Sequence, residues 1–184
     1  VDVACRGSDF LSCRTSVGGF LRYFLAHLSV RRGGLSLHAA SVVHGAGAFV
    51  LMAHSGGGKT TFARRFGAGG VLADDHSFVL PWRNRMWVWP SPFPGREGMV
   101  VDPDPMPLIG LAHLARGPST RWMALPKVDR IEALMAHAVL FDTDTVTRQL
   151  LLDQVLRLER RVGRLELDLD HDPWEALTRG LAFS

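Results

Sequence analysis

Lysine and cysteine are both scarce in this chain, and each scarcity is informative. Only two of the 21 basic residues are lysines, Lys59 and Lys127, and the others are arginines. The two cysteines, Cys5 and Cys13, are too few for a disulfide framework, and no further Cys or His pair has the spacing of a zinc site. No hydrophobic run reaches the roughly 20 residues that a membrane-spanning helix needs. We therefore expect a protein of the reducing cytoplasm that does not enter the membrane.

A large net charge of either sign is also missing. The formal net charge is +3 over 184 residues, and the arginines are scattered rather than gathered into a stripe or a tail. Protein surfaces that bind nucleic acid concentrate positive charge in one place. Because this chain shows no such concentration, we predict that it does not bind nucleic acid. A chain of this length buries about 70% of its unfolded surface in one core, so we expect residues 1–184 to form a single domain. The chain begins at Val1 rather than at a methionine, which suggests that a segment preceded it.

Hydrophobic periodicity predicts alternating helices and strands along the chain. The predicted helices cover residues 17–31, 59–66, 127–138 and 144–162, and a final helix follows an N-cap at Asp172. The predicted strands cover residues 35–44, 48–53, 71–73, 77–82, 85–89, 108–114, 121–125 and 164–170. Residues 90–107 are rich in proline and glycine and are expected to form a functional loop. This order indicates an α/β fold in which a mixed central sheet is flanked by helices.

A glycine-rich run, AHSGGGKTT at residues 53–61, follows one predicted strand and opens a predicted helix. It is typical of a phosphate-binding loop, in which backbone N–H groups and a lysine surround phosphate oxygens. The usual pattern G-x-x-x-x-G-K-[ST] is met except at its first position, where Ala53 replaces glycine. The residues expected to bind the nucleotide are Ser55, Gly56, Gly57, Gly58, Lys59, Thr60 and Thr61. The hydroxyl of Thr60 would bind Mg²⁺; the alternative is a flexible turn with an incidental lysine.

Two adjacent acids, Asp74 and Asp75, follow the next predicted strand, fifteen and sixteen residues after Lys59. A short helix and a turn return the chain to a strand beside the loop, so both carboxylates should reach the phosphates. One acid can help to hold Mg²⁺ while the other accepts a proton from an attacking hydroxyl. The alternative is a solvated turn or a helix cap. His76 follows the pair and is a candidate to orient the acids by hydrogen bonding, or simply ends the turn.

His38 lies twenty-one residues before Lys59, on the predicted strand 35–44. A lone histidine on an apolar strand is more often a core residue. Together, however, the three segments resemble the HPr kinase family and its small relatives, which share a histidine before the loop, the loop itself and an Asp-Asp pair. The matching segments read LHAA at 37–40, SGGGKT at 55–60 and LADD at 72–75, and the resemblance covers about residues 35–80.

The resemblance implies an HPr kinase/PEP carboxykinase-like nucleotide-binding core and a kinase that uses ATP and Mg²⁺. Such an enzyme passes the γ-phosphate to a serine or another hydroxyl of a peptide, a protein or a small molecule. Carried over to this chain, Asp74 is the proton acceptor, Asp75 lies near the metal, Lys59 contacts the phosphates and His38 lies near the transferred group. Both acids are within reach of either role. Family members often assemble into oligomers, so the resemblance also suggests a homo-oligomer.

The chain lacks the Arg-Gly-x-Gly type of segment that the family associates with phosphorolysis and partner recognition, so we do not expect it to act on HPr itself. Arg96 in the loop is a candidate to clamp a phosphate or an acidic acceptor, or is an ordinary solvated arginine. Two other functions stay open. One is an ATP-binding regulatory module that shapes residues 90–107 without transferring phosphate, and the other is carboxykinase-type chemistry.

Overall fold

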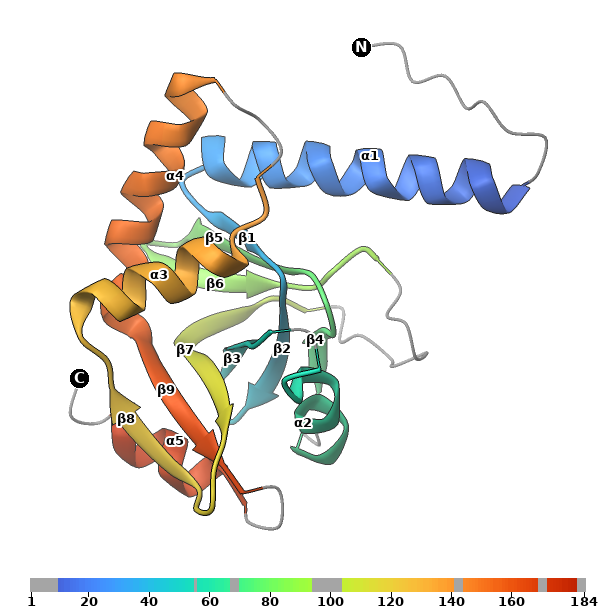
Figure 1. The fold of residues 1–184 in the computed structure, drawn as a ribbon. Helices are drawn as coiled ribbons and strands as arrows, with labels where there is room; N and C mark the ends of the chain where they lie inside the picture. The colour runs from blue at the N-terminus through green and yellow to red at the C-terminus, as the bar shows by residue number, and fades with distance from the viewer. Residues whose placement is uncertain are drawn as a thin grey trace.

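The architecture of the chain was taken from a computed structural model. The described residues are 10–54, 56–66, 70–93, 104–140, 144–168 and 172–181. They form a curled, mixed β-sheet with helices on both faces (Figure 1). The predicted α/β class, with a mixed sheet and flanking helices, is therefore confirmed. Within the described residues, no helix combines the length and the apolar character that a membrane span requires.

The sheet comprises nine strands in the described part of the chain. They are β1 (Leu35–Leu37), β2 (Ala39–His44), β3 (Gly47–Met52), β4 (Val71–Ala73), β5 (Ser77–Trp82), β6 (Arg85–Trp89), β7 (Met106–Arg116), β8 (Arg121–Ala124) and β9 (Val162–Leu167). The main order is β1-β5-β6-β7-β3-β2-β4, and β9 pairs with both β7 and β8. Strand β7 runs parallel to β3 and to β9, whereas the other pairs are antiparallel.

Two hydrophobic cores lie on opposite faces of this sheet. The helices are α1 (Phe10–Arg31), α2 (Lys59–Phe66), α3 (Lys127–His137), α4 (Thr145–Leu158) and α5 (Trp174–Leu181), with a 3₁₀ turn at Glu159–Arg161. Buried side chains of α1, α3 and α4 belong to one core, and those of α2 and α5 belong to the other. Strand β3 separates them, because Val50 and Met52 contact the first core while Phe49 and Leu51 contact the second. This two-sided burial explains why β3 is hydrophobic at every position.

The predicted strand 35–44 is divided into two strands at His38. Before this residue, β1 pairs with β5, and after it β2 pairs with β3, opposite Met52. The sheet curls so strongly that one chain segment supplies the first strand of the order, β1, and also β2, the last but one. The backbone N–H of His38 leaves the ladder and donates to the carbonyl of His137, at 2.7 Å. The prediction of one continuous strand was wrong because this crossing depends on long-range pairing.

Other expected elements agree with the structure, apart from their ends. The hairpin of β5 and β6 turns at Arg83 and Asn84, whose φ values of 47° and 64° suit a tight two-residue turn. The predicted helix 144–162 ends earlier, at Leu158, and Val162 already belongs to β9. Gly163, the residue after the predicted helix, makes room for the neighbouring strand. A Cβ at Gly163 would lie 2.1 Å from the ring of Trp122.

Candidate functional site

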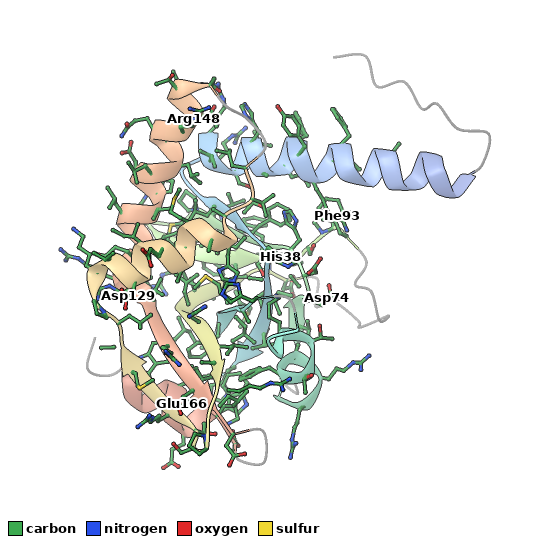
Figure 2. The ribbon with its side chains drawn as sticks, viewed as in Figure 1. His38, Asp74, Phe93, Asp129, Arg148 and Glu166 are labelled. Carbon is green, nitrogen blue, oxygen red and sulfur yellow. The ribbon has the colours of Figure 1, made fainter. Side chains whose placement is uncertain are left out.

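Three segments that are distant in sequence meet at one edge of the sheet. Strands β3 and β4 both pair antiparallel with β2, so they run in the same direction and end at the same edge. The glycine-rich loop leaves β3 there, and Asp74 leaves β4 there. His38 precedes β2 at the same edge, because the next residue, Ala39, pairs with Met52. Figure 2 shows His38 and Asp74 close together beside α2.

The glycine-rich loop depends on its glycines for its backbone conformation. Gly56 and Gly58 have φ values of 75° and 96°, in the region that favours glycine, and space is open where a Cβ would stand. Gly57 is constrained by crowding instead, since a Cβ there would lie 2.7 Å from the Cβ of Ala53. Among the described residues, positive φ outside glycine occurs only at Arg83 and Asn84. Ala53 therefore fits where the usual pattern has glycine.

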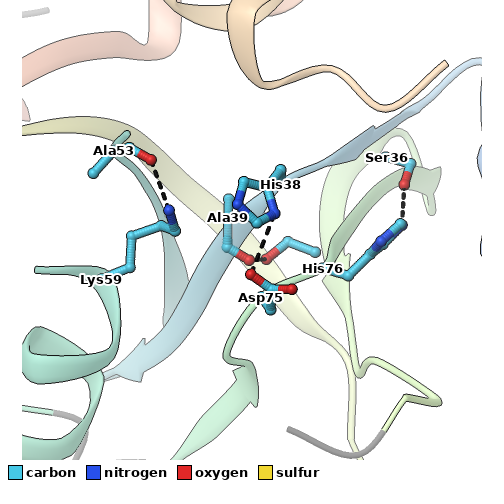
Figure 3. Close-up of polar contacts among 8 residues, drawn as sticks. Ser36, His38, Ala39, Ala53, Lys59, Asp75 and His76 are labelled. Atoms are coloured by element: carbon cyan, nitrogen blue, oxygen red, sulfur yellow. Dashed lines mark hydrogen bonds and ion pairs between the residues drawn. The ribbon is translucent and has the colours of Figure 1, made fainter. Parts of the chain in front are cut away.

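Lys59 opens α2 and points back into the loop. Its Nζ donates a hydrogen bond to the carbonyl oxygen of Ala53 at 2.6 Å, as Figure 3 shows. The side chain is buried, with 8% of its surface exposed. Burial lowers the pKa of Lys59, and the negative charge of Asp75 opposes that shift. The ammonium is thus held inside the loop by a carbonyl, at the place where phosphate oxygens would enter.

The predicted acids occupy different environments. Asp75 Oδ1 lies 3.2 Å from His38 Nδ1, and both side chains are open to solvent, with exposed fractions of 38% and 47% (Figure 3). Asp74 is buried, with 8% exposed. The structure therefore brings His38, Asp75 and the charge of Lys59 together. Asp74, the residue before Asp75 in the sequence, is buried.

His76 attaches the segment after the acids to the neighbouring part of the sheet. Its Nε2 and the hydroxyl oxygen of Ser36 are 2.5 Å apart, and both residues are buried. The ring packs against Phe78 and Phe93, with centroid distances of 4.8 and 5.6 Å. Burial, followed by the positive charge of Arg22, lowers the pKa of His76 to about 4. This neutral, buried ring fixes the backbone on which the two acids stand.

The loop residues fit a nucleotide phosphate, and the nearby oxygens fit Mg²⁺. The first turn of α2 is closed by the bond from the Phe62 N–H to the Gly58 carbonyl, at 2.8 Å, so the helix begins at the loop. Thr60 and Asp75 are both half-buried. Mg²⁺ usually takes one or two protein oxygens together with substrate phosphates and waters, which these two residues could supply.

Two predicted residues, Ser55 and Arg96, lie outside the described residues, as does most of the segment 90–107. One group of residues was missed: His54, His113 and His137, which come from the loop, from β7 and from the end of α3. Their ring centroids lie 6.1, 5.9 and 5.8 Å apart. No local signal marks them, because they are far apart in the sequence. Within the described part of the chain, no group of three or more His, Cys, Asp or Glu is arranged to hold a metal ion.

The chain was also compared with known proteins. No protein-family model matches it, and the comparison with curated proteins gave no match.

Proposed function

We propose that this protein is a Mg-ATP-dependent kinase with an HPr kinase-like core, which transfers the γ-phosphate of ATP to a hydroxyl group. One observation carries the proposal. His38 and Asp75 are in contact at 3.2 Å, at the edge where the glycine-rich loop also begins. A phosphate loop alone supports binding, whereas an exposed acid and a histidine beside its lysine support transfer.

In this proposal, the loop holds the phosphates and its lysine neutralises them. The N–H groups of Gly56 and of residues 58–61 surround the phosphate oxygens, whereas the Gly57 N–H donates to the His54 carbonyl at 2.9 Å. Lys59 exchanges the Ala53 carbonyl for the outer phosphates. Thr60 and one of the acids hold Mg²⁺, which supplies charge neutralisation at the transferred group when it is bound. An ammonium suits this position because it is a compact charge, whereas the guanidinium that the chain uses elsewhere is wide and planar.

Each of the two acids has a role in the transfer. The resemblance assigns the proton acceptor to Asp74 and the metal side to Asp75. The geometry supports the opposite assignment, with Asp75 as the proton acceptor, because Asp75 is the acid that is exposed to solvent and in contact with His38. A proton acceptor must come within hydrogen-bond distance of the attacking hydroxyl, so exposure favours Asp75 for that step.

Single substitutions test the proposal and separate the two roles. We expect Asp74→Asn and Asp75→Asn to retain ATP binding, and the variant that removes the proton acceptor to lose about 10²- to 10⁴-fold in transfer rate. Transfer would be measured with γ-³²P-labelled ATP and an extract of the native host, and binding by calorimetry. Asp153→Asn on the exposed face of α4 is the matched control. Full transfer by both variants, or no binding of Mg-ATP by the wild type, would contradict the proposal.

A second candidate is an ATP-binding regulatory module that transfers no phosphate. It is favoured by the bond between Lys59 Nζ and the Ala53 carbonyl, because a lysine that stays on this carbonyl would not assist transfer. In that case Lys59→Ala would change ATP affinity little, and labelled phosphate would reach no acceptor. A loss of affinity of tenfold or more in Lys59→Ala favours the kinase.

A further inference from the structure

A cavity of about 310 Å³ lies beside the phosphate loop, between α3 and the sheet. It is lined by the three histidines described above, by Asp129 and Glu132 of α3, and by Arg164 of β9, among others. Resting on the proposed kinase function, we propose that this cavity binds the phosphate acceptor, and that the acceptor is a small hydroxyl compound that carries an ammonium group. The volume is at the lower end of the range of small-molecule sites.

The cavity and the phosphate loop share a wall. His113 is in register with Met52, the last residue of β3, and His54 belongs to the loop itself. Lys59 binds the Ala53 carbonyl beside the cavity, and burial together with the positive charge of Lys59 lowers the pKa of His137. A molecule in the cavity would therefore lie next to the lysine that contacts the outer phosphates.

The histidines give the cavity a polar floor. Burial lowers the pKa of His113 and of His137; the hydrogen bond to the Ala133 carbonyl opposes the shift of His137, and the charge of Lys59 adds to it. These shifts favour the uncharged form of the two rings, in which each has one N–H donor and one acceptor nitrogen. His137 is buried and uses Nδ1 at the Ala133 carbonyl, at 2.8 Å. Neutral imidazoles of this kind can hold a hydroxyl, which also both donates and accepts.

The mouth of the cavity carries the charge that selects a cation. Asp129 and Glu132 are three residues apart on α3 and therefore lie on one face of the helix, and both are exposed. Arg164, on β9, provides one opposing charge, and it contributes to the low pKa of His113. Among the residues that line the cavity, two carboxylates stand against one guanidinium, which leaves an excess of negative charge at the mouth. An ammonium group is attracted there, and an anionic acceptor is repelled.

The direction of phosphate transfer fixes how such an acceptor would lie in the cavity. Its ammonium lies at the two carboxylates of α3, and its hydroxyl points past the histidines toward the loop. The hydroxyl oxygen forms a bond to the γ-phosphorus, the bond from this phosphorus to the bridging oxygen breaks, and ADP leaves. The hydroxyl proton passes to Asp75 or Asp74. The end of α3 is tied to this edge, because the His137 carbonyl accepts from the His38 N–H at 2.7 Å.

Matched pairs of small molecules test the charge preference. Ethanolamine and 3-amino-1-propanol would be compared with the uncharged ethylene glycol and 1,3-propanediol, in the presence of Mg²⁺ and a non-hydrolysable ATP analogue. Binding would be followed through the imidazole NMR signals of the three cavity histidines, assigned with single His→Gln variants. We expect at least tenfold tighter binding of the amines, and we expect Asp129→Asn/Glu132→Gln to remove that preference. Asp153→Asn is the control, and urea unfolding would verify that both variants remain folded.

The outcomes separate this inference from the proposed function. If the ATP analogue fails to bind, the kinase proposal fails, while the amine titration still reports on the cavity. If the analogue binds but the amines leave the histidine signals unchanged, or the diols bind equally well, the cavity assignment is overturned. Transfer of labelled phosphate to an amine, reduced at least tenfold in the double variant, would support both.

Discussion

At the scale of single residues, the site is organised by how much water reaches each charged group. Asp75 and His38 meet in contact with solvent, where a substrate can approach, whereas Lys59 is enclosed by the loop. The low pKa of Lys59 follows from this enclosure, and the carboxylate of Asp75 works against it. Removing that carboxylate therefore destabilises the ammonium of Lys59 and also removes the contact with His38, so the two halves of the site are electrostatically linked.

His76 makes the stability of the fold depend on pH. Its pKa is about 4 in the folded protein, against an ordinary value of 6.5, so the unfolded chain takes up this proton first as the pH falls. The stabilisation is complete above the ordinary value and is lost as the pH falls toward 4. From pH 7 to pH 5 we expect a loss of about 2 kcal/mol from this residue. Urea unfolding at both pH values would measure it.

The matched variant for that experiment is His76→Gln, which keeps a polar group near the Ser36 hydroxyl and cannot be protonated. Its loss of stability between the two pH values should be smaller than that of the wild type by the same amount. His113 and His137 also lower stability as the pH falls, but they do so in both proteins. The difference in stability loss between the wild type and His76→Gln therefore reports on His76. Equal losses in both proteins would show that this residue does not couple pH to folding.

At the scale of elements, the start of α4 depends on one capping side chain. Asp144 accepts from the Thr147 backbone N–H at 2.9 Å and from the Thr147 hydroxyl at 2.5 Å. Thr147 is fully buried, so both of its donors need this partner. Helix α4 packs against α1 and β1, and its cap therefore supports the layer that covers one face of the sheet.

Replacing this cap should destabilise the protein by a measurable amount. We expect Asp144→Ala to lower the free energy of unfolding by about 1 kcal/mol, within the range of 0.5–2 kcal/mol for helix caps. Asp144→Asn retains an acceptor oxygen and should keep most of the stability. Chemical denaturation of the two variants beside the wild type provides the measurement. If alanine and asparagine had the same effect, the capping interpretation would be refuted.

Elements whose signals are local could be predicted from the sequence. The hairpin turn at Arg83 and Asn84, helix α2 and strand β4 have the predicted bounds, because turn chemistry and periodicity act over a few residues. The end of α4 was misplaced because Val162 continues the helical pattern but pairs with Leu111 in the sheet. The division at His38 was missed for the same kind of reason, since a partner from another part of the chain decides it.

At the scale of the whole molecule, one sheet separates two cores, and a short C-terminal helix completes the second of them. Leu177 of α5 is fully buried, and Trp174 stacks on His44 at a centroid distance of 4.1 Å. Phe49 and Phe62 also face Trp174, at 5.8 and 5.7 Å. Because β3 borders both cores, loss of packing on one face is transmitted to the other, and we expect the domain to unfold in a single transition.

Leu177→Ala tests this dependence on α5. A cavity in the second core should cost about 2–5 kcal/mol of unfolding free energy, and circular dichroism should still show one transition. The control is Leu156→Ala on α4, where the side chain is 43% exposed and the cost should stay within about 1 kcal/mol. Two separate transitions in the Leu177 variant would mean that the faces unfold independently.

The sequence by itself determined the α/β class, the glycine-rich loop between a strand and a helix, and the Asp-Asp pair after the following strand. These depend on backbone preferences and on spacing within a few tens of residues, which local chemistry dictates. Only the tertiary structure decided that β7 lies between β3 and β9, that His38 stands at a crossing of the sheet, and that His113 and His137 join His54 beside the loop. Strand pairing and helix packing are chosen by burial over the whole chain, so no short pattern contains them.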